Sequence, residues 1–72
     1  MLREIRRLLT ARPFVPFTIY PADGAGMRVP TADHAVISPT GSLIVVFFDD
    51  DTGQFLSPLL ITRVGVDDLS TM

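Results

Sequence analysis

The chain contains no cysteine and no lysine, a single histidine, and no long apolar run. Without cysteine it cannot form disulfides or thiolate metal sites, so apolar packing has to stabilise the fold. A membrane-spanning helix needs ~20 consecutive apolar residues, whereas the longest run here, residues 43–48, has six. The start of the chain carries charge at Arg3, Glu4, Arg6 and Arg7, where a signal peptide would be apolar. We therefore expect a cytoplasmic protein that has no membrane partner.

What the sequence does contain is an unusually apolar composition for its length. A chain of 72 residues forms one domain and buries only about 60% of its unfolded surface. Hydrophobic residues nevertheless make up 47% of it. Either the core is rich, or some apolar surface is covered by another chain. The composition thus predicts a homo-oligomer or a complex with another protein.

The charges are unevenly distributed along the chain. Residues 1–12 hold four arginines and one glutamate, a net +3, and residues 13–72 hold two arginines and seven aspartates, a net −5. A basic segment on an acidic body can be a partner surface. It can equally be a solvated helix face whose arginines pair with acids of the same or a neighbouring copy.

The rest of the fold is expected to be arranged around residues 42–48, Ser-Leu-Ile-Val-Val-Phe-Phe. This stretch is β-branched and aromatic, is too short for an ordinary helix, and has turn residues on both sides. A strand with one exposed face would alternate apolar and polar residues, and this one does not. The pattern therefore predicts a strand with both faces covered.

One amphipathic helix is predicted over residues 2–11. Leu2, Ile5 and Leu9 recur at helical spacing on one side, and Pro13 ends the helix because the residue before a proline avoids the α region. A helix this short is marginal in water unless its leucines dock against something. It either covers one side of the sheet or forms an interface.

Short strands separated by turns fill the rest of the chain. Prolines at 16 and 21 indicate that the first strand starts at a sheet edge. Turns are predicted at Asp23-Gly24, Ser38–Gly41 and 49–53. The sequence predicts a mainly β fold, namely a small, strongly bent sheet or barrel of five or six strands with one N-terminal α-helix, forming a single domain over 1–66 with a frayed tail at 67–72. The predicted strands are 14–20, 27–29, 35–37, 42–48, 54–56 and 59–66, and 30–34 is predicted to form a helical or 3₁₀ turn that Thr31 can cap.

No motif in the sequence predicts catalysis. Asp49-x-Asp51-x-Gly53 begins like a calcium loop, but Leu60 stands where the late glutamate would be, so a solvated turn is the better interpretation. His34 has no cysteine or second histidine with which to bind zinc. We expect no enzyme activity, no catalytic residue, no cofactor and no metal. An enzyme or ligand site would require a deep pocket in which His34 meets Asp33 or a carboxylate of 49–51.

The most plausible functional surface is a partner-binding one. We expect a protein-interaction or self-assembly module that uses either the helix stripe or the edge strand at 14–20, the latter by adding a strand to a sheet. The candidate partner-binding residues are Leu2, Ile5, Arg6 and Leu9.

Several motifs resemble a family of short uncharacterised bacterial proteins with the order RPFxPFxI…DG…V…SPxG. The matching segments cover nearly the whole chain, and no activity comes with the resemblance. They are residues 12–19 (RPFVPFTI), Asp23-Gly24, Val29-Pro30, Ser38–Gly41 (SPTG) and residues 59–62 (LLIT).

A looser resemblance is to the Sm-like fold, which is related in shape to SH3 barrels, and especially to its bacterial RNA chaperone. Residues 15–20 with Asp23-Gly24 are similar to its first strand and turn, 33–37 to the entry of its third strand, and 61–64 to its last strand. The resemblance implies a small barrel and an alternative function as a ring-forming RNA-binding protein. However, Ser57-Pro58-Leu59 stands where the chaperone has its RNA-contacting Tyr-Lys-His triplet.

Overall fold

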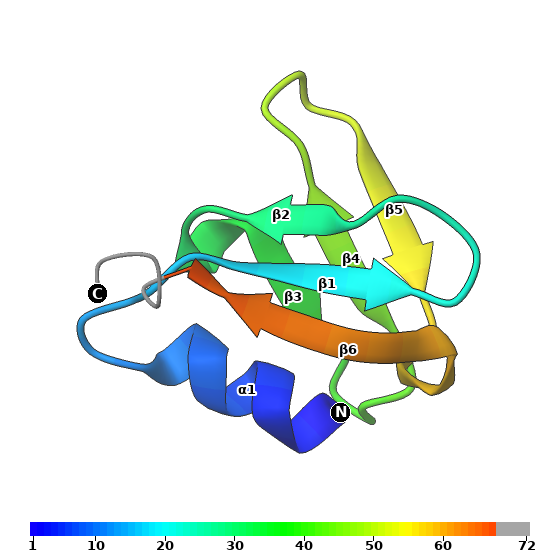
Figure 1. Cartoon of the computed structure of the whole chain (residues 1–72), viewed down its shortest axis with the longest axis horizontal. Coiled ribbons are helices and arrows are strands. Elements are labelled where there is room, and N and C mark those ends of the chain that lie inside the picture. Colours follow the sequence, from blue (N-terminus) through cyan, green and yellow to red (C-terminus); the bar gives the residue numbers. More distant parts are fainter. Residues whose placement is uncertain (68–72) are drawn as a thin grey trace.

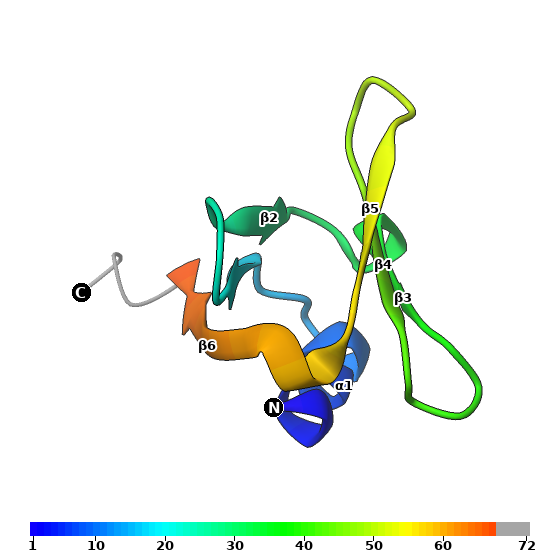
Figure 2. The ribbon, with the colours of Figure 1, turned by 90° about the vertical axis from the view of Figure 1, so that its right-hand side faces the viewer.

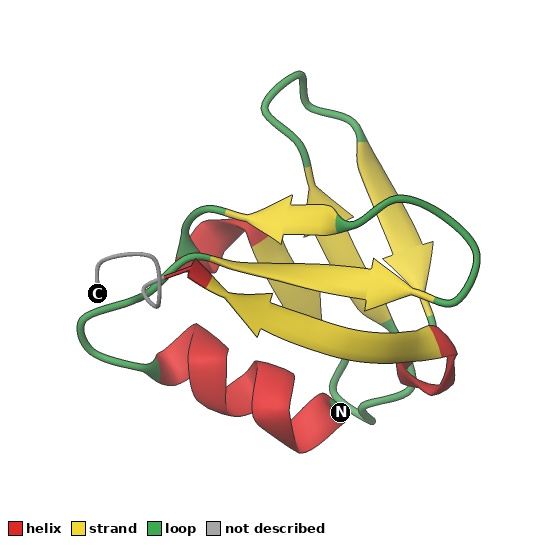
Figure 3. Ribbon diagram, viewed as in Figure 1, coloured by secondary structure: helices red, strands yellow, loops and turns green. Residues whose placement is uncertain are grey.

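The computed structural model describes residues 1–67 and contains one α-helix, six short strands and two 3₁₀ turns (Figures 1 and 3). The predicted mainly β fold with an N-terminal helix is confirmed. The elements are α1 (Leu2–Thr10), β1 (Phe17–Pro21), β2 (Met27–Val29), η1 (Ala32–His34), β3 (Ala35–Ile37), β4 (Ile44–Phe47), β5 (Gly53–Leu56), η2 (Pro58–Leu60) and β6 (Ile61–Val66).

The strands form two antiparallel three-stranded sheets, ordered β2-β1-β6 and β3-β4-β5. The chain passes from one sheet to the other at η1, between β2 and β3, and returns at η2, between β5 and β6. Figure 2 shows the two sheets facing each other at an angle, with α1 filling the opening between them. Over residues 1–67 the two sheets share no strand, so the structure is not a closed barrel.

A core of apolar side chains lies between the sheets and α1. No polar or charged side chain of residues 1–67 is buried, so the core depends on the hydrophobic effect and on packing alone. Its buried members are Ile5, Leu8, Phe17, Ile19, Met27, Val29, Ala35, Ile44, Val46, Leu56 and Ile61.

The turns form where their residues predict them. Gly24 and Gly41 have φ of +146° and +77°, in the region that only glycine occupies without strain. Gly41 closes its turn by donating its backbone N–H to the carbonyl of Ser38 at 2.9 Å. Thr31 caps η1 by accepting the N–H of Asp33 at 3.2 Å, as predicted.

The prediction that the first strand starts at a sheet edge is wrong. β1 is the central strand of its sheet and pairs with β2 on one side and β6 on the other. Pro16 precedes the strand, and at Pro21 the pairing with β6 shifts register, so neither proline interrupts a regular ladder. β-Augmentation at residues 14–20 is therefore not available.

One strand boundary near the end of the chain differs from prediction. Leu59 and Leu60 belong to η2 rather than to the last strand, because Pro58 starts a 3₁₀ turn that Ser57 caps. Asp67, the first residue of the predicted frayed tail, donates its backbone N–H to the carbonyl of Pro16 at 3.0 Å, and its carboxylate pairs with Arg28. The remainder of that tail, 68–72, lies outside the described residues.

Candidate functional site

The predicted partner-binding stripe of α1 faces the interior of its own chain. Ile5 is fully buried, and Leu2 and Leu9 are half-buried against the core. Arg6 is exposed. Partner binding by these four residues stays a prediction, but three of them already pack within the monomer.

A contiguous row of exposed apolar side chains lies instead on the outer side of β3-β4-β5. Val36, Val45 and Phe55 stand opposite one another across the three strands, and Phe47 follows Val45 on the same side of β4. Val36 is 51% exposed, Phe47 44% and Phe55 73%. We call these four residues the outer face. In Figure 2 no ribbon of the described chain lies over it.

The outer face corrects the expectation that both sides of the central strand are covered. Ile44 and Val46 point into the core and are fully buried, whereas Val45 is half-buried and Phe47 exposed. A continuous apolar run carries no period from which to tell an inner from an outer side. The sequence signal for this face is Phe55, an aromatic residue that follows Gly53 and the polar Gln54 in a short strand.

An acidic loop, Asp49–Asp51, borders one end of the outer face. Asp51 has a positive φ of 69°, which aspartate tolerates better than most residues. Thr52 donates two hydrogen bonds to the carboxylate of Asp50, one from its hydroxyl at 2.6 Å and one from its backbone N–H at 3.1 Å. These hydrogen bonds, the hydroxyl's most of all, lower the pKa of Asp50 because they stabilise its ionised form.

The opposite end of the outer face is formed by the turn over residues 38–42. This turn contains no acid, and the guanidinium of Arg6 lies beside it: Nη2 would be 3.9 Å from a Cβ placed on Gly41. α1, which carries Arg6, packs on the core side of this sheet (Figure 2), so Arg6 approaches the turn from the side opposite the outer face.

His34 links η1 to the acidic loop. Its Nδ1 lies 2.8 Å from Thr31 Oγ1, and its Nε2 lies 2.9 Å from Asp49 Oδ1. His34 and Asp49 lie beside a shallow hollow of about 370 Å³ that Arg28 and Phe47 also line. His34 thus meets a carboxylate of residues 49–51, which is the contact that an enzyme or ligand site at this histidine would require. However, Thr31 already caps η1 and Asp49 is 91% exposed at its side chain, so the contact ties two chain segments together.

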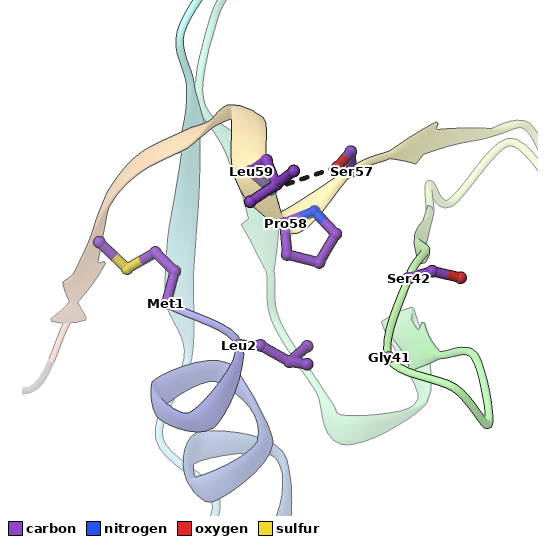
Figure 4. Close-up of a pocket in the computed structure, with 7 residues that line it drawn as sticks. All are labelled: Met1, Leu2, Gly41, Ser42, Ser57, Pro58 and Leu59. Carbon is purple, nitrogen blue, oxygen red and sulfur yellow. Dashed lines mark hydrogen bonds between the residues drawn. The ribbon is translucent and has the colours of Figure 1, made fainter.

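A second hollow lies where the start of α1, the turn over 38–42 and η2 meet (Figure 4). It has a volume of about 520 Å³ and is mainly apolar. Its most exposed member is Leu59, which is 92% exposed. Ser57, Pro58 and Leu59 line this hollow. These are the three residues that the resemblance to the Sm-like RNA chaperone aligns with its RNA-contacting Tyr-Lys-His triplet. The lining residues are Met1, Leu2, Gly41, Ser42, Ser57, Pro58 and Leu59.

Between Met1 and Asp67, no group of three or more His, Cys, Asp or Glu side chains is arranged to hold a metal ion. Within the same residues, no helix is long and apolar enough to cross a membrane. Comparison with known proteins found no matching family model, no matching curated protein and no matching solved structure.

Proposed function

We propose that this chain is a non-catalytic self-assembly module whose contact surface is the outer face. The observation that carries the proposal is the row Val36–Val45–Phe55, which crosses all three strands of one sheet and is exposed at both ends. Isolated apolar side chains on a surface are ordinary, whereas a contiguous group marks a site of interaction. A second copy of this chain is the proposed occupant, because a row of apolar side chains that crosses a whole sheet can stack on the same row of another copy about a two-fold axis.

The size of the outer face predicts weak association. Complete burial of one Val or Phe side chain contributes about 1.5–3 kcal/mol, and association first has to offset about 4–15 kcal/mol of lost translational and rotational freedom. Four side chains are also far fewer than the ~20–30 residues per partner of a standard interface. We therefore expect a dimer that forms only at high protein concentration and dissociates on dilution.

The test is the mass in solution, measured by light scattering after size exclusion over a range of concentrations. We expect the mass to rise with concentration for the unmodified protein and to stay monomeric for Phe55→Ser. Leu59→Ser is the matched control, because it removes an even more exposed apolar side chain from η2, away from the outer face. A strict monomer at high micromolar concentration would refute the proposal, and loss of assembly in Leu59→Ser alone would move the interface to the second hollow.

An Sm-like, ring-forming RNA-binding protein is the second candidate. In its favour, the chain crosses between the sheets at η1 and again at η2, as a strongly bent barrel requires. The motif order also supports a relationship to the short bacterial family described above. Arg3, Arg6 and Arg12 are exposed on or next to α1 and could meet phosphates.

Titration with short single-stranded RNA at low and high salt tests this second candidate. Phosphate contacts predict binding at low salt that weakens steeply as salt is added. The triple variant Arg3→Gln/Arg6→Gln/Arg12→Gln should then lose most of the affinity. Absence of binding at low salt would eliminate RNA as the partner, and salt-insensitive binding would eliminate the arginine contacts.

A further inference from the structure

We infer that β5 is a self-pairing edge: two copies of this chain join their β5 strands in antiparallel orientation, with Gln54 opposite the partner's Gln54, so that the two β3-β4-β5 sheets become one continuous sheet. This inference goes beyond the proposed function, because the contact is made by the backbone at a sheet edge and not by stacking of the outer face. It follows from the direction of the backbone groups of β5 and from the exposure of its edge.

Two residues of β5 point their backbone hydrogen-bonding groups away from β4. Phe48 donates its N–H to the carbonyl of Thr52 at 2.7 Å, directly beyond the pair Phe47–Gly53. Hydrogen-bonded and non-hydrogen-bonded pairs alternate along an antiparallel ladder. Gly53 and Phe55 therefore belong to non-hydrogen-bonded pairs, and their N–H and C=O groups face the free edge of the sheet.

Of the four edge strands over residues 1–67, β5 has the least protected edge. Gly53 and Phe55 are exposed, whereas Ala35 of β3, the opposite edge strand, is only 5% exposed. In the other sheet, the edge strands β2 and β6 carry Arg28 and Arg63. Charges and covering segments are usual protections against edge-to-edge pairing. β5 has no charged residue, and Figure 1 shows it at the margin of the molecule.

A hollow beside β5 leaves room for an added strand. It has a volume of about 390 Å³ and is lined on one side by the consecutive residues 54–57. Because neighbouring residues of a strand point to opposite faces, a hollow lined by four residues in a row lies along the edge of the strand. Pro21, Met27 and Leu60 are among the residues on its other side. An added strand would therefore gain apolar contacts as well as backbone hydrogen bonds.

A second copy of β5 matches this edge best when Gln54 lies on a two-fold axis. Gly53 then stands opposite the partner's Phe55, and each such pair can exchange two hydrogen bonds. With Phe55 on the axis, Gly53 would instead need the carbonyl of Ser57, which already accepts the N–H of Leu60 at 2.9 Å. With Gly53 on the axis, the two acidic loops would be brought together. The register centred on Gln54 avoids both problems.

The side chains agree with this register. Gly53 has no side chain, and the ring of Phe47 lies beside it, with Cδ1 3.4 Å from where a Cβ would be. The partner's Phe55 would approach the same glycine from the other strand, so that aromatic rings from both copies cover it. A second copy is the occupant because it supplies this phenylalanine and this glycine at the positions where the edge needs them.

Cysteine at the axis tests the pairing directly, because the natural chain contains no cysteine. Residue 54 would face its own copy in a non-hydrogen-bonded pair with Cα atoms about 4.5 Å apart, which is within the range of a disulfide. Residue 52 would lie about 13 Å along the strand from its own copy, beyond that range. Gln54→Cys and Thr52→Cys are therefore matched variants, and both positions are exposed in the same hairpin.

Both variants are oxidised over a range of protein concentrations, and mass spectrometry follows the formation of the linked dimer. We expect Gln54→Cys to link about tenfold faster or more than Thr52→Cys, because pairing raises the local concentration of the second thiol. Equal rates would overturn the inference. The proposed function would survive that result if the mass of the unmodified protein still rose with concentration, because residue 54 pairs with buried Val46 on the inner side of the sheet and plays no part in outer-face stacking.

Amide hydrogen exchange gives a second readout that needs no substitution. The N–H of Phe55 should exchange fast in dilute protein and become protected at high concentration. The N–H of Ile37, which by the same alternation faces the free edge of β3, is the matched control and should gain much less protection. Equal gains at both amides would indicate covering of the outer face without edge pairing, and would contradict the inference.

A peptide with the sequence of residues 52–57, TGQFLS, tests whether a second copy is the preferred occupant of the edge. It should slow disulfide formation in Gln54→Cys, and a scrambled peptide of the same composition should not. Equal slowing by both peptides would show that the edge accepts any extended strand, which would overturn the choice of a second copy.

Discussion

At the scale of single residues, stability depends on a few fully inaccessible side chains. The largest of them are Phe17, Ile5, Ile19, Ile44, Val29 and Val46. A domain of this size has few such side chains, and its net stability is a small difference between large terms. Each of them therefore matters more here than it would in a larger domain.

Ile5 provides a direct test, because it joins α1 to the core. Ile5→Val should lower the free energy of unfolding by about 0.5–1.5 kcal/mol and Ile5→Ala by about 2–5 kcal/mol, as buried methyl groups are removed and a cavity forms. Urea denaturation measures both. Leu59→Ala, at an exposed position, should change the value by less than about 0.5 kcal/mol. Equal effects at the two positions would mean that α1 does not pack as described.

Gly41 provides a second test, of backbone conformation rather than packing. Its φ of +77° disfavours any side chain, and an added Cβ would lie 2.8 Å from Leu2 Cδ2. Gly41→Ala should therefore cost about 1–2 kcal/mol of unfolding free energy. Thr40→Ala, one residue earlier in the same turn, is the control. A neutral Gly41→Ala would show that the turn adopts another conformation.

At the scale of elements, the β4–β5 connection couples stability to pH. Because hydrogen bonds from Thr52 lower the pKa of Asp50 in the folded protein, they contribute stability at pH values above the ordinary carboxyl pKa. That contribution is lost as the pH falls through the lowered value. Thr52→Val removes the hydroxyl hydrogen bond, so the difference in stability between it and the unmodified protein should shrink below about pH 4. Urea denaturation from pH 7 to pH 3 measures this difference. A pH-independent difference would mean that Thr52 acts without Asp50.

The sequence predicts well where the helix, strands and turns form, but it predicts poorly which strands pair with one another. α1, η1 and the turns at Gly24 and Gly41 form from nearby residues, through an apolar stripe, a threonine cap and positive φ. The central position of β1 depends on its pairing with β6, whose residues lie 40 to 49 positions further along the chain, and no local sequence pattern reveals that pairing. The outer face was missed for a related reason: which side of β4 meets the core depends on where the other sheet lies.

At the scale of the whole molecule, β1 and β5 differ most in how they are held. β1 is the central strand of its sheet and buries Phe17 and Ile19, whereas β5 is paired only with β4 and three of its four residues are exposed. Local opening is easiest where few contacts hold an element. The less supported strand, β5, is also the one that carries Phe55 of the proposed contact surface.

Amide hydrogen exchange tests this difference. In dilute protein, where the monomer dominates, we expect the paired amides of β1 to exchange most slowly and those of β5 to exchange fastest among the strands. At high concentration, β3, β4 and β5 should gain protection if the outer face is covered by a second copy. Uniform protection across both sheets in the monomer would contradict the difference in support, and unchanged exchange at high concentration would contradict covering of the face.

The acidic loop that follows β4 also bears on what happens before the chain folds. Residues 43–48 are six consecutive apolar residues of high β-propensity, without charge or proline, which is the composition that stacks into amyloid fibrils. Identical chains in such a fibril lie about 4.8 Å apart, so Asp49, Asp50 and Asp51 would form three continuous ladders of negative charge. At neutral pH this repulsion makes the loop a gatekeeper against aggregation of the newly made chain. In acid the ladders become neutral, and the same apolar strand that completes the core becomes the segment most prone to form fibrils.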